Sequence, residues 1–382
     1  MISYVIPTRD RPDCLARTLG ALGGLSRHDA EVIVVDNASD PPFQVPHTLE
    51  NGLPVVFIQR ATNEGAAARN VGVRASDPAS EWIVMLDDDS HPMDLGFIEA
   101  LHEQPRDVAV VCAEIFLDRP ARGGLSGSLR MRESGGLPEI PIGCGVAYRR
   151  AAFLDARIGD TAGYDPSFGF YAEEYDLAAR LMRAGRRIVM DRRFQVLHRK
   201  TPAGRSMDVI LRRLVRNNCW VMGRYAPSGV RAEEVRRALA RYARIAMKER
   251  AMSGYAMGLV ELASSWGRQP RLELSAREWD RFTGKAACRR SLLAAWGERR
   301  FATAAVVSWG GSKNEHVVRE CLVEMGVDVV EDERGAEALV IGTLSPGPML
   351  DALDALGSDR RVIAPWAVAG RVLDGEVTRV AA

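Results

Sequence analysis

The chain has 382 residues, of which 47% are hydrophobic and 26% charged, as is typical of a globular protein with two or three domains rather than a disordered chain. Lysine and arginine number 51 against 50 acidic residues, so the net charge of +1 gives no electrostatic reason to expect nucleic acid as a partner. The six cysteines form no CxxC pair, and the opening MISYVIPTRDRPD has the pattern of neither a signal peptide nor a spanning helix. We therefore expect a cytoplasmic protein with reduced thiols and no transmembrane segment.

The first two hundred residues alternate short apolar runs with segments of helical periodicity. This alternation predicts an α/β domain over residues 1–205, with a mainly parallel sheet covered by helices on both faces. The expected order is strand, helix, strand, strand, helix, strand, strand, over residues 2–6, 13–22, 31–35, 55–59, 66–75, 82–86 and 108–116. A further strand is expected over residues 187–197, and the glycine-rich stretch 123–136 is expected to be a loop.

The rest of the chain divides into two further parts. Residues 206–300 carry arginine-rich amphipathic patterns and are expected to be helical. From residue 301 strand patterns return between helices, which predicts a small α/β domain over residues 301–382. Its TAAVVSWGGS lacks the GxGxxG of a dinucleotide site, so we expect this domain to serve docking or homo-oligomerisation, or to cover an acceptor cleft.

The chemistry predicted for the first domain centres on three adjacent carboxylates, Asp87, Asp88 and Asp89, which follow the apolar run IVML. Like charges so close raise one another's pKa unless a cation lies among them, and hard oxygen ligands suit Mg²⁺ or Mn²⁺. A solvated acidic turn is the alternative. Polar clusters also end three other expected strands, at the edge where such sheets bind ligands. These clusters are Thr8 to Asp10, Asp36 with Asn37, and Arg60 to Asn63.

Five segments together resemble glycosyltransferase family 2, the nucleotide-sugar enzymes of Rossmann-like GT-A fold, over roughly residues 1–201. In chain order they are VIPTRDRPDCLARTLGAL, EVIVVDNASD, NEGAAARNVGV, LDDD and FGFYAEEYDLAARLMRAG. The chain departs from the usual family pattern at Asp10, where asparagine is common, at Asn37, where a second acid is common, and at Glu174, where aspartate is common.

The resemblance implies roles for particular residues. Asp87 and Asp89 match the DxD motif that holds the metal and the sugar diphosphate, and His198 matches a histidine that completes the metal site or contacts the diphosphate. Glu174 occupies the position of the general base, with Asp176 as its rival. The residues implied at the nucleotide or donor are Pro7, Thr8, Arg9, Asp36, Asn37, Asn63, Arg69, Asp87 and Asp88, of which Asp36 contacts the base or ribose. Gly143, Cys144 and Gly145 are the implied donor or acceptor loop.

The activity implied is an inverting hexosyl transfer, dependent on Mg²⁺ or Mn²⁺, from a UDP, dTDP or GDP sugar to an acceptor hydroxyl or amine. The acceptor would be a small-molecule natural product or a cell-envelope glycan. One alternative is a nucleotidyltransferase that makes sugar nucleotides, which would carry a GxGxR-type loop where this chain has PTRDRP. Another is a non-catalytic sugar-nucleotide-binding protein, which would lack a base and a metal pair.

Overall fold

The computed structural model of the chain describes residues 1–117, 130–131, 136–200, 206–357 and 359–366. Most of the predicted loop at residues 123–136 and the end of the predicted C-terminal domain lie outside the described residues. The chain divides into two compact units. Unit 1 comprises Met1–Glu114 with Pro141–Ala276, and unit 2 comprises Ile115–Ile140 with Arg277–Ala382.

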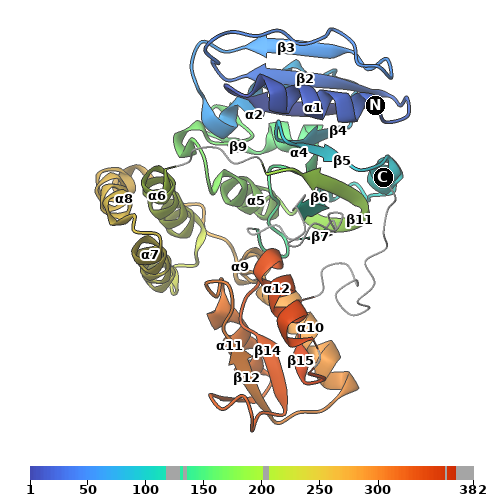
Figure 1. Cartoon of the computed structure of the whole chain (residues 1–382). Coiled ribbons are helices and arrows are strands. Elements are labelled where there is room, and N and C mark those ends of the chain that lie inside the picture. Colours follow the sequence, from blue (N-terminus) through green and yellow to red (C-terminus); the bar gives the residue numbers. More distant parts are fainter. Residues whose placement is uncertain (118–129, 132–135, 201–205, 358, 367–382) are drawn as a thin grey trace. The chain divides into compact units, whose positions relative to one another are not determined.

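The main sheet has the strand order β3-β2-β1-β4-β8-β6-β11-β5, and its first four strands are parallel (Figure 1). All four were expected from sequence, and three extend or contract by one or two residues. They are β1 (Ile2–Thr8), β2 (Ala30–Asp36), β3 (Val55–Gln59) and β4 (Trp82–Met85). Every residue of β2 and β4 is buried, which explains their unbroken apolar runs.

The other half of the sheet is mixed, so the predicted parallel arrangement holds for one half only. Strand β8 runs antiparallel to both β4 and β6, and β11 runs antiparallel to β5. Neither β8 nor β5 was expected, because four and three residues are too few to show a periodic pattern. The bounds are β5 (Ser90–Pro92), β6 (Val108–Leu117), β8 (Val146–Arg149) and β11 (Arg187–His198).

Short helices connect these strands. The two expected helices are present as α1 (Pro12–Gly23) and α2 (Ala68–Ala75), which is preceded by the 3₁₀ turn η1 (Gly65–Ala67), and a further helix, α5 (Glu173–Arg183), precedes β11. Also present are α3 (Gly96–His102), α4 (Arg150–Asp155), η2 (Pro166–Phe168) and the hairpin of β9 (Arg157–Ile158) and β10 (Thr161–Ala162). Large side chains such as Tyr4, Trp82 and Tyr148 are almost fully buried in the core between these layers.

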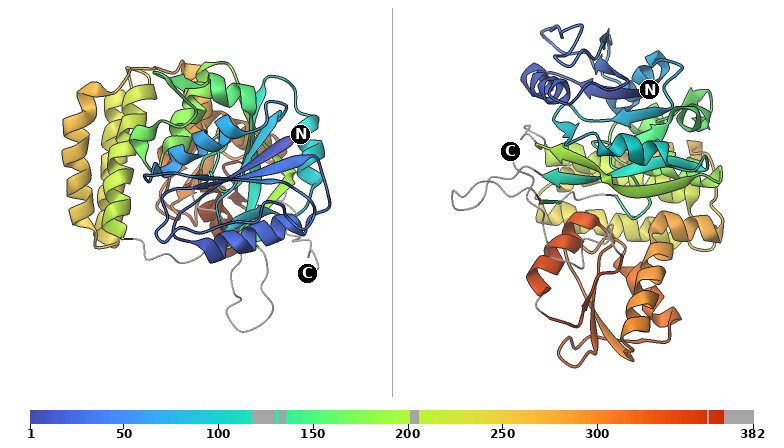
Figure 2. Two further views of the ribbon diagram at one scale, coloured as in Figure 1. Left: turned by 90° about the horizontal axis from the view of Figure 1, so that it is seen from above. Right: turned by 90° about the vertical axis from the view of Figure 1, so that its right-hand side faces the viewer.

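Three long helices complete unit 1 and pack against one another (Figure 2). They are α6 (Met207–Tyr225), α7 (Arg231–Lys248) and α8 (Met252–Ser265), followed by η3 (Trp266–Arg268). Their shared core contains Leu211, Val215, Tyr242, Ala246 and Ala251. Among the described helices, none combines the length and apolarity needed to cross a membrane.

Unit 2 contains a small parallel sheet of order β13-β12-β14-β15, as the sequence predicted. Its elements are α9 (Ala276–Thr283), α10 (Lys285–Glu298), β12 (Thr303–Val307), α11 (Glu315–Glu324), β13 (Asp328–Val330), β14 (Ala338–Ile341), α12 (Pro346–Leu356) and β15 (Val362–Ile363). The two-residue strand β7 (Arg130–Met131) pairs with the end of β6. The helices expected over residues 206–300 are divided between the units, with α6 to α8 in unit 1 and α10 in unit 2.

Candidate active site

The carboxyl ends of the parallel strands bring several of the predicted residues to one edge of the sheet. Pro7 and Thr8 end β1, Asp36 ends β2, and the aspartate triplet begins two residues after β4. The Thr8 hydroxyl donates a hydrogen bond of 2.9 Å to Asp88 Oδ2, which joins the first strand end to the triplet. Parallel strands that share one direction deliver their carboxyl ends to the same edge, so these contacts follow from the topology.

Asp88 and Asp89 are both held by Arg11, a residue that the sequence reasoning did not single out. Its Nη1 lies 2.7 Å from Asp88 Oδ1 and its Nη2 lies 2.7 Å from Asp89 Oδ2. Burial raises the pKa of Asp88 to about 6, although Arg11 and Thr8 oppose the shift. Burial also acts on Asp89, but hydrogen bonds from His198 and Arg11 hold the pKa of Asp89 below its usual range. Arg11 was detectable in sequence, since it stands three residues beyond the first strand in the TRDRPD segment.

Asp87 faces a different set of partners. Its carboxylate, the Cys144 thiol and the His198 ring each offer one ligand atom, and these three atoms lie within 4.8 Å of one another. His198 Nε2 also lies 3.2 Å from Asp89 Oδ1. The structure thus brings together Asp87, Asp89 and His198, the three predicted metal ligands, and adds Cys144 from the predicted donor or acceptor loop.

The registers of two antiparallel strand pairs position these side chains. Met85 of β4 pairs with Val146 of β8, so continuing the register by two residues places Asp87 opposite Cys144. His198 pairs with Ser90, and the next backbone N–H, that of Arg199, donates to the Asp89 carbonyl at 2.9 Å. Main-chain pairing therefore sets the spacing of the cluster.

Glu174 lies at the start of α5, close to Gly143 and Arg69. Arg69 forms an ion pair with Asp87 through its Nη2 and is itself 5% exposed. A Cβ added to Gly143 would lie 3.2 Å from Glu174 Oε1 and 3.5 Å from Arg69 Nη2, so the glycine allows the backbone to approach both groups. Burial raises the pKa of Glu174, while neighbouring backbone N–H groups and Arg69 oppose that shift.

Glu173, the neighbour of Glu174, is 4% exposed and its Oε2 has no hydrogen-bond partner among the described residues. Burial, reinforced by the charge of Glu174, raises the pKa of Glu173 well above its usual value. Two buried carboxylates this close disfavour simultaneous ionisation of Glu173 and Glu174.

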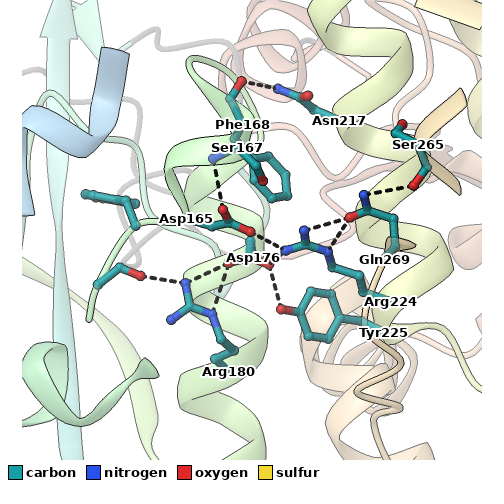
Figure 3. A network of polar contacts seen from close by, with 12 residues as sticks. Asp165, Ser167, Phe168, Asp176, Arg180, Asn217, Arg224, Tyr225, Ser265 and Gln269 are labelled. Carbon is teal, nitrogen blue, oxygen red and sulfur yellow. Dashed lines mark hydrogen bonds and ion pairs between the residues drawn. The ribbon is translucent and has the colours of Figure 1, made fainter. Parts of the chain in front are cut away.

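Asp176, the second predicted candidate for the base, is fully buried in a separate network (Figure 3). Its Oδ2 accepts hydrogen bonds from Arg180 at 2.6 and 3.0 Å, and its Oδ1 accepts from Arg224 at 2.7 Å and from the Tyr225 hydroxyl at 2.6 Å. Arg224 also pairs with Asp165 at 2.8 Å. We therefore assign Asp176 a structural role, because both of its oxygens are bound by the protein itself.

The same network positions the loop that precedes α5. Asn217 of α6 donates to the carbonyls of Phe168, Phe170 and Tyr171 at 3.0, 2.9 and 2.7 Å (Figure 3 shows the first of these). These contacts fix the chain immediately before Glu173 and Glu174. The side-chain amide of Asn217 therefore ties α6 to the loop that precedes Glu173 and Glu174.

The remaining predicted nucleotide residues hold loops at this edge. Asn37 donates to the Gly65 carbonyl at 3.0 Å and accepts from the Glu64 N–H at 2.7 Å, while Asn63 Oδ1 accepts from the Gly65 N–H at 2.9 Å. Asp36, 2% exposed, accepts from the backbone and hydroxyl of Ser39 at 3.1 and 2.5 Å.

Arg9 is exposed and lies outside the cluster of buried groups. Its Nε is 3.3 Å from Asp10 Oδ2, and both side chains are about half exposed. The Gly145 carbonyl accepts a hydrogen bond from the Ala113 N–H of β6 at 3.1 Å, which ties the residue after Cys144 to the main sheet.

Comparison with known proteins identifies the N-terminal segment. Residues 3–155, which include the aspartate triplet, Arg69 and Cys144, match the family model described as Glycosyl transferase family 2. This match over residues 3–155 confirms the resemblance to glycosyltransferase family 2 that the sequence motifs indicated. A search of curated proteins gave no match.

Three solved structures are similar to this chain. GalNAc-T7 with UDP, GalNAc and Mn²⁺ is 15% identical with a TM-score of 0.47, and the match covers 71% of this chain and 58% of that one. TarS 1–349 of S. aureus is 15% identical with a TM-score of 0.38, over 70% and 91% of the two chains. The mannosyltransferase PcManGT of Pyrobaculum calidifontis with GDP-Man and Mn²⁺ is 14% identical with a TM-score of 0.42, over 78% and 83%.

Proposed function

We propose that the chain is a metal-dependent glycosyltransferase that moves a sugar from a nucleoside diphosphate to an acceptor hydroxyl or amine, with inversion at the sugar carbon. The observation that carries the proposal is the cluster of ligand atoms from Asp87, Cys144 and His198, with Glu174 close to Gly143 and Arg69 beside it. Asp87 and Cys144 lie in the segment that matches the glycosyltransferase family 2 model, and Glu174 and His198 follow that segment. A carboxylate and an imidazole are donors that suit a divalent cation. The donor set therefore fits the metal that the family resemblance implies.

The residues of this chain take distinct roles in the proposed reaction. Asp87 and His198 would hold the cation, and Asp89 orients His198 through its 3.2 Å contact. When bound, the cation supplies positive charge that stabilises the departing diphosphate. Asp36 and the loop held by Asn37 and Asn63 would accommodate the nucleoside.

Glu174 is proposed to remove the acceptor proton. The acceptor oxygen attacks the sugar carbon as the bond to the diphosphate oxygen breaks, and the proton passes to the Glu174 carboxylate. A base with a raised pKa is better matched to this step near neutral pH than an exposed glutamate is. Arg69 forms an ion pair with Asp87, and its charge opposes the rise in the pKa of Glu174.

Release of nucleoside diphosphate from a panel of UDP, dTDP and GDP sugars tests the proposal, with water or added alcohols as acceptors. We expect one donor to be consumed in Mn²⁺ and not after EDTA treatment. Asp87→Asn should abolish this turnover, whereas Asp160→Asn, an exposed carboxylate in the turn between β9 and β10, should leave it unchanged. Consumption of a sugar phosphate and a nucleoside triphosphate instead would favour the nucleotidyltransferase, and donor binding without turnover the non-catalytic protein.

A further inference from the structure

The cluster of possible metal ligands in unit 1, formed by Asp87, Cys144 and His198, offers a sulfur atom as well as oxygen and nitrogen. The ligand atoms of Asp87, Cys144 and His198 lie within 4.8 Å of one another. Atoms that share one cation at about 2.0–2.3 Å are about 3–4 Å apart, so small side-chain rotations would close the three around a single ion. We propose that Cys144 Sγ is a ligand of this cation and makes the site prefer Mn²⁺, Co²⁺ or Zn²⁺ to Mg²⁺. The inference rests on the proposed function, because it specifies the cation on which that function depends.

The backbone on both sides of Cys144 is fixed. The strand that follows it, β8, lies between β4 and β6, and its Val146 pairs with both Met85 and Cys112. The Gly145 N–H donates to the Ile142 carbonyl at 3.2 Å, which closes a tight turn around Cys144. The position of the sulfur beside Asp87 is therefore a consequence of the sheet register.

The surroundings of Cys144 differ from those of a thiol that only fills an apolar core. Its side chain is 2% exposed, yet its nearest ligand-type neighbours are a carboxylate and an imidazole from two other strand ends. All six cysteines of the chain are buried and none forms a disulfide, but Cys144 alone belongs to a metal-compatible group within the described residues.

The chemistry of sulfur determines which cations such a site would bind. A thiolate is a soft ligand that Zn²⁺ and later transition metals accept, whereas Mg²⁺ requires near-octahedral oxygen ligands and loses its water reluctantly. Affinity for nitrogen and sulfur sites rises from Mn²⁺ through Co²⁺ along the transition series. One oxygen, one nitrogen and one sulfur still leave positions open for diphosphate oxygens. Binding would release the thiol proton to solvent, and no electron transfer is involved.

The direct alternative is that Asp89, rather than Cys144, is the third ligand. Asp89 is already bound by Arg11 at 2.7 Å and by His198 at 3.2 Å. Carboxylates in such contact with a metal-binding histidine usually orient the ring and keep it basic. The two arrangements differ in one observable property, because only a sulfur ligand gives a sulfur-to-metal charge-transfer absorption.

The test uses the metal-free full-length protein and CoCl₂ alone, followed by absorption spectroscopy. We expect the wild-type protein to develop a near-ultraviolet charge-transfer band as Co²⁺ binds. Cys144→Ser should lose the band and bind Co²⁺ at least about 10–100-fold more weakly, while its affinity for Mg²⁺ should change much less. Cys219→Ser removes another fully buried thiol of unit 1, on α6, and should keep the band.

Competition on the unaltered protein provides a second readout that needs no substitution. Mn²⁺ should displace Co²⁺ at a far lower concentration than Mg²⁺ does. Co²⁺ binding without a charge-transfer band, or equal displacement by Mg²⁺ and Mn²⁺, would overturn the role of Cys144 and leave the metal-dependent function standing. Failure of the wild-type protein to bind any of the three cations would overturn both.

Discussion

Replacing Asp176 by asparagine tests whether its carboxylate has a structural or a catalytic role. The carboxylate is fully buried and accepts four hydrogen bonds, from Arg180, Arg224 and the Tyr225 hydroxyl, at 2.6 to 3.0 Å. An amide of the same shape turns one acceptor oxygen into a donor that faces arginine N–H groups, and it removes the charge that balances them.

The expected loss in the free energy of unfolding follows from the burial of the Asp176 ion pairs. Removing one partner of a buried ion pair costs about 3–5 kcal/mol, because the other charge remains in a poor solvent. Arg224 retains its contact with Asp165, and Arg180 retains the Gly163 carbonyl at 2.7 Å, so the lower half of that range is expected. With an m-value of about 3 kcal/mol/M, the urea midpoint of unit 1 should fall by about 1 M.

Urea unfolding of the full chain, followed by far-ultraviolet circular dichroism, measures this shift. Glu174→Gln is the matched control, since it makes the same chemical change two residues earlier in the same helix. We expect Glu174→Gln to unfold near the wild-type midpoint. An Asp176→Asn variant that unfolds like the wild type but has lost turnover would refute the structural assignment and transfer the proton acceptor to Asp176.

Three further results are expected. Glu174→Gln should lower kcat by about 10²–10⁴-fold with little change in donor affinity measured by calorimetry, and an unchanged kcat would exclude this base. Wild-type activity should rise with pH through an apparent pKa above the usual glutamate value in a pH–rate profile, because the base acts only when ionised. Asp36→Ala should weaken nucleoside diphosphate binding by the same factor with Mn²⁺ and with EDTA, and a loss seen only with Mn²⁺ would place Asp36 at the cation. Gly65→Ala should destabilise unit 1 by more than about 1 kcal/mol in thermal unfolding, because Gly65 has a φ of +62° and an added Cβ would lie 2.2 Å from the Gly169 carbonyl oxygen. A wild-type Tm would show that the loops containing Gly65 and Gly169 can separate at no cost.

The sequence predicted the elements that have strong periodicity. The strand Val55–Gln59 matches the prediction residue for residue, the other predicted strands of the first domain differ from theirs by one or two residues, and the small α/β unit after residue 301 is confirmed. The antiparallel half of the sheet was missed, because β8 is four residues long and follows a Gly-Cys-Gly turn that reads as a break. Local pattern carries little information about pairing between strands that lie sixty residues apart.

The candidate site was predictable to the same extent. The position of Asp87 and Asp89 at a strand end and the position of His198 after another strand were visible in sequence, and the structure brings them together. The neighbourhood of Cys144 was not visible, since it depends on the β4–β8 register. The burial of Asp176 was also hidden, because its partners Arg224 and Tyr225 come from a helix about fifty residues further along the chain.

Thermal unfolding in the presence of UDP, dTDP, GDP and ADP, each with Mn²⁺ or with EDTA, tests the central claim most directly because it requires no knowledge of the acceptor. A ligand that binds the folded state at a hundred times its Kd stabilises it by about 2.7 kcal/mol, which gives a measurable rise in Tm. We predict that at least one of these nucleoside diphosphates raises the Tm with Mn²⁺ and loses most of that effect with EDTA. No stabilisation by any of them under either condition would contradict a metal-dependent nucleotide-sugar site.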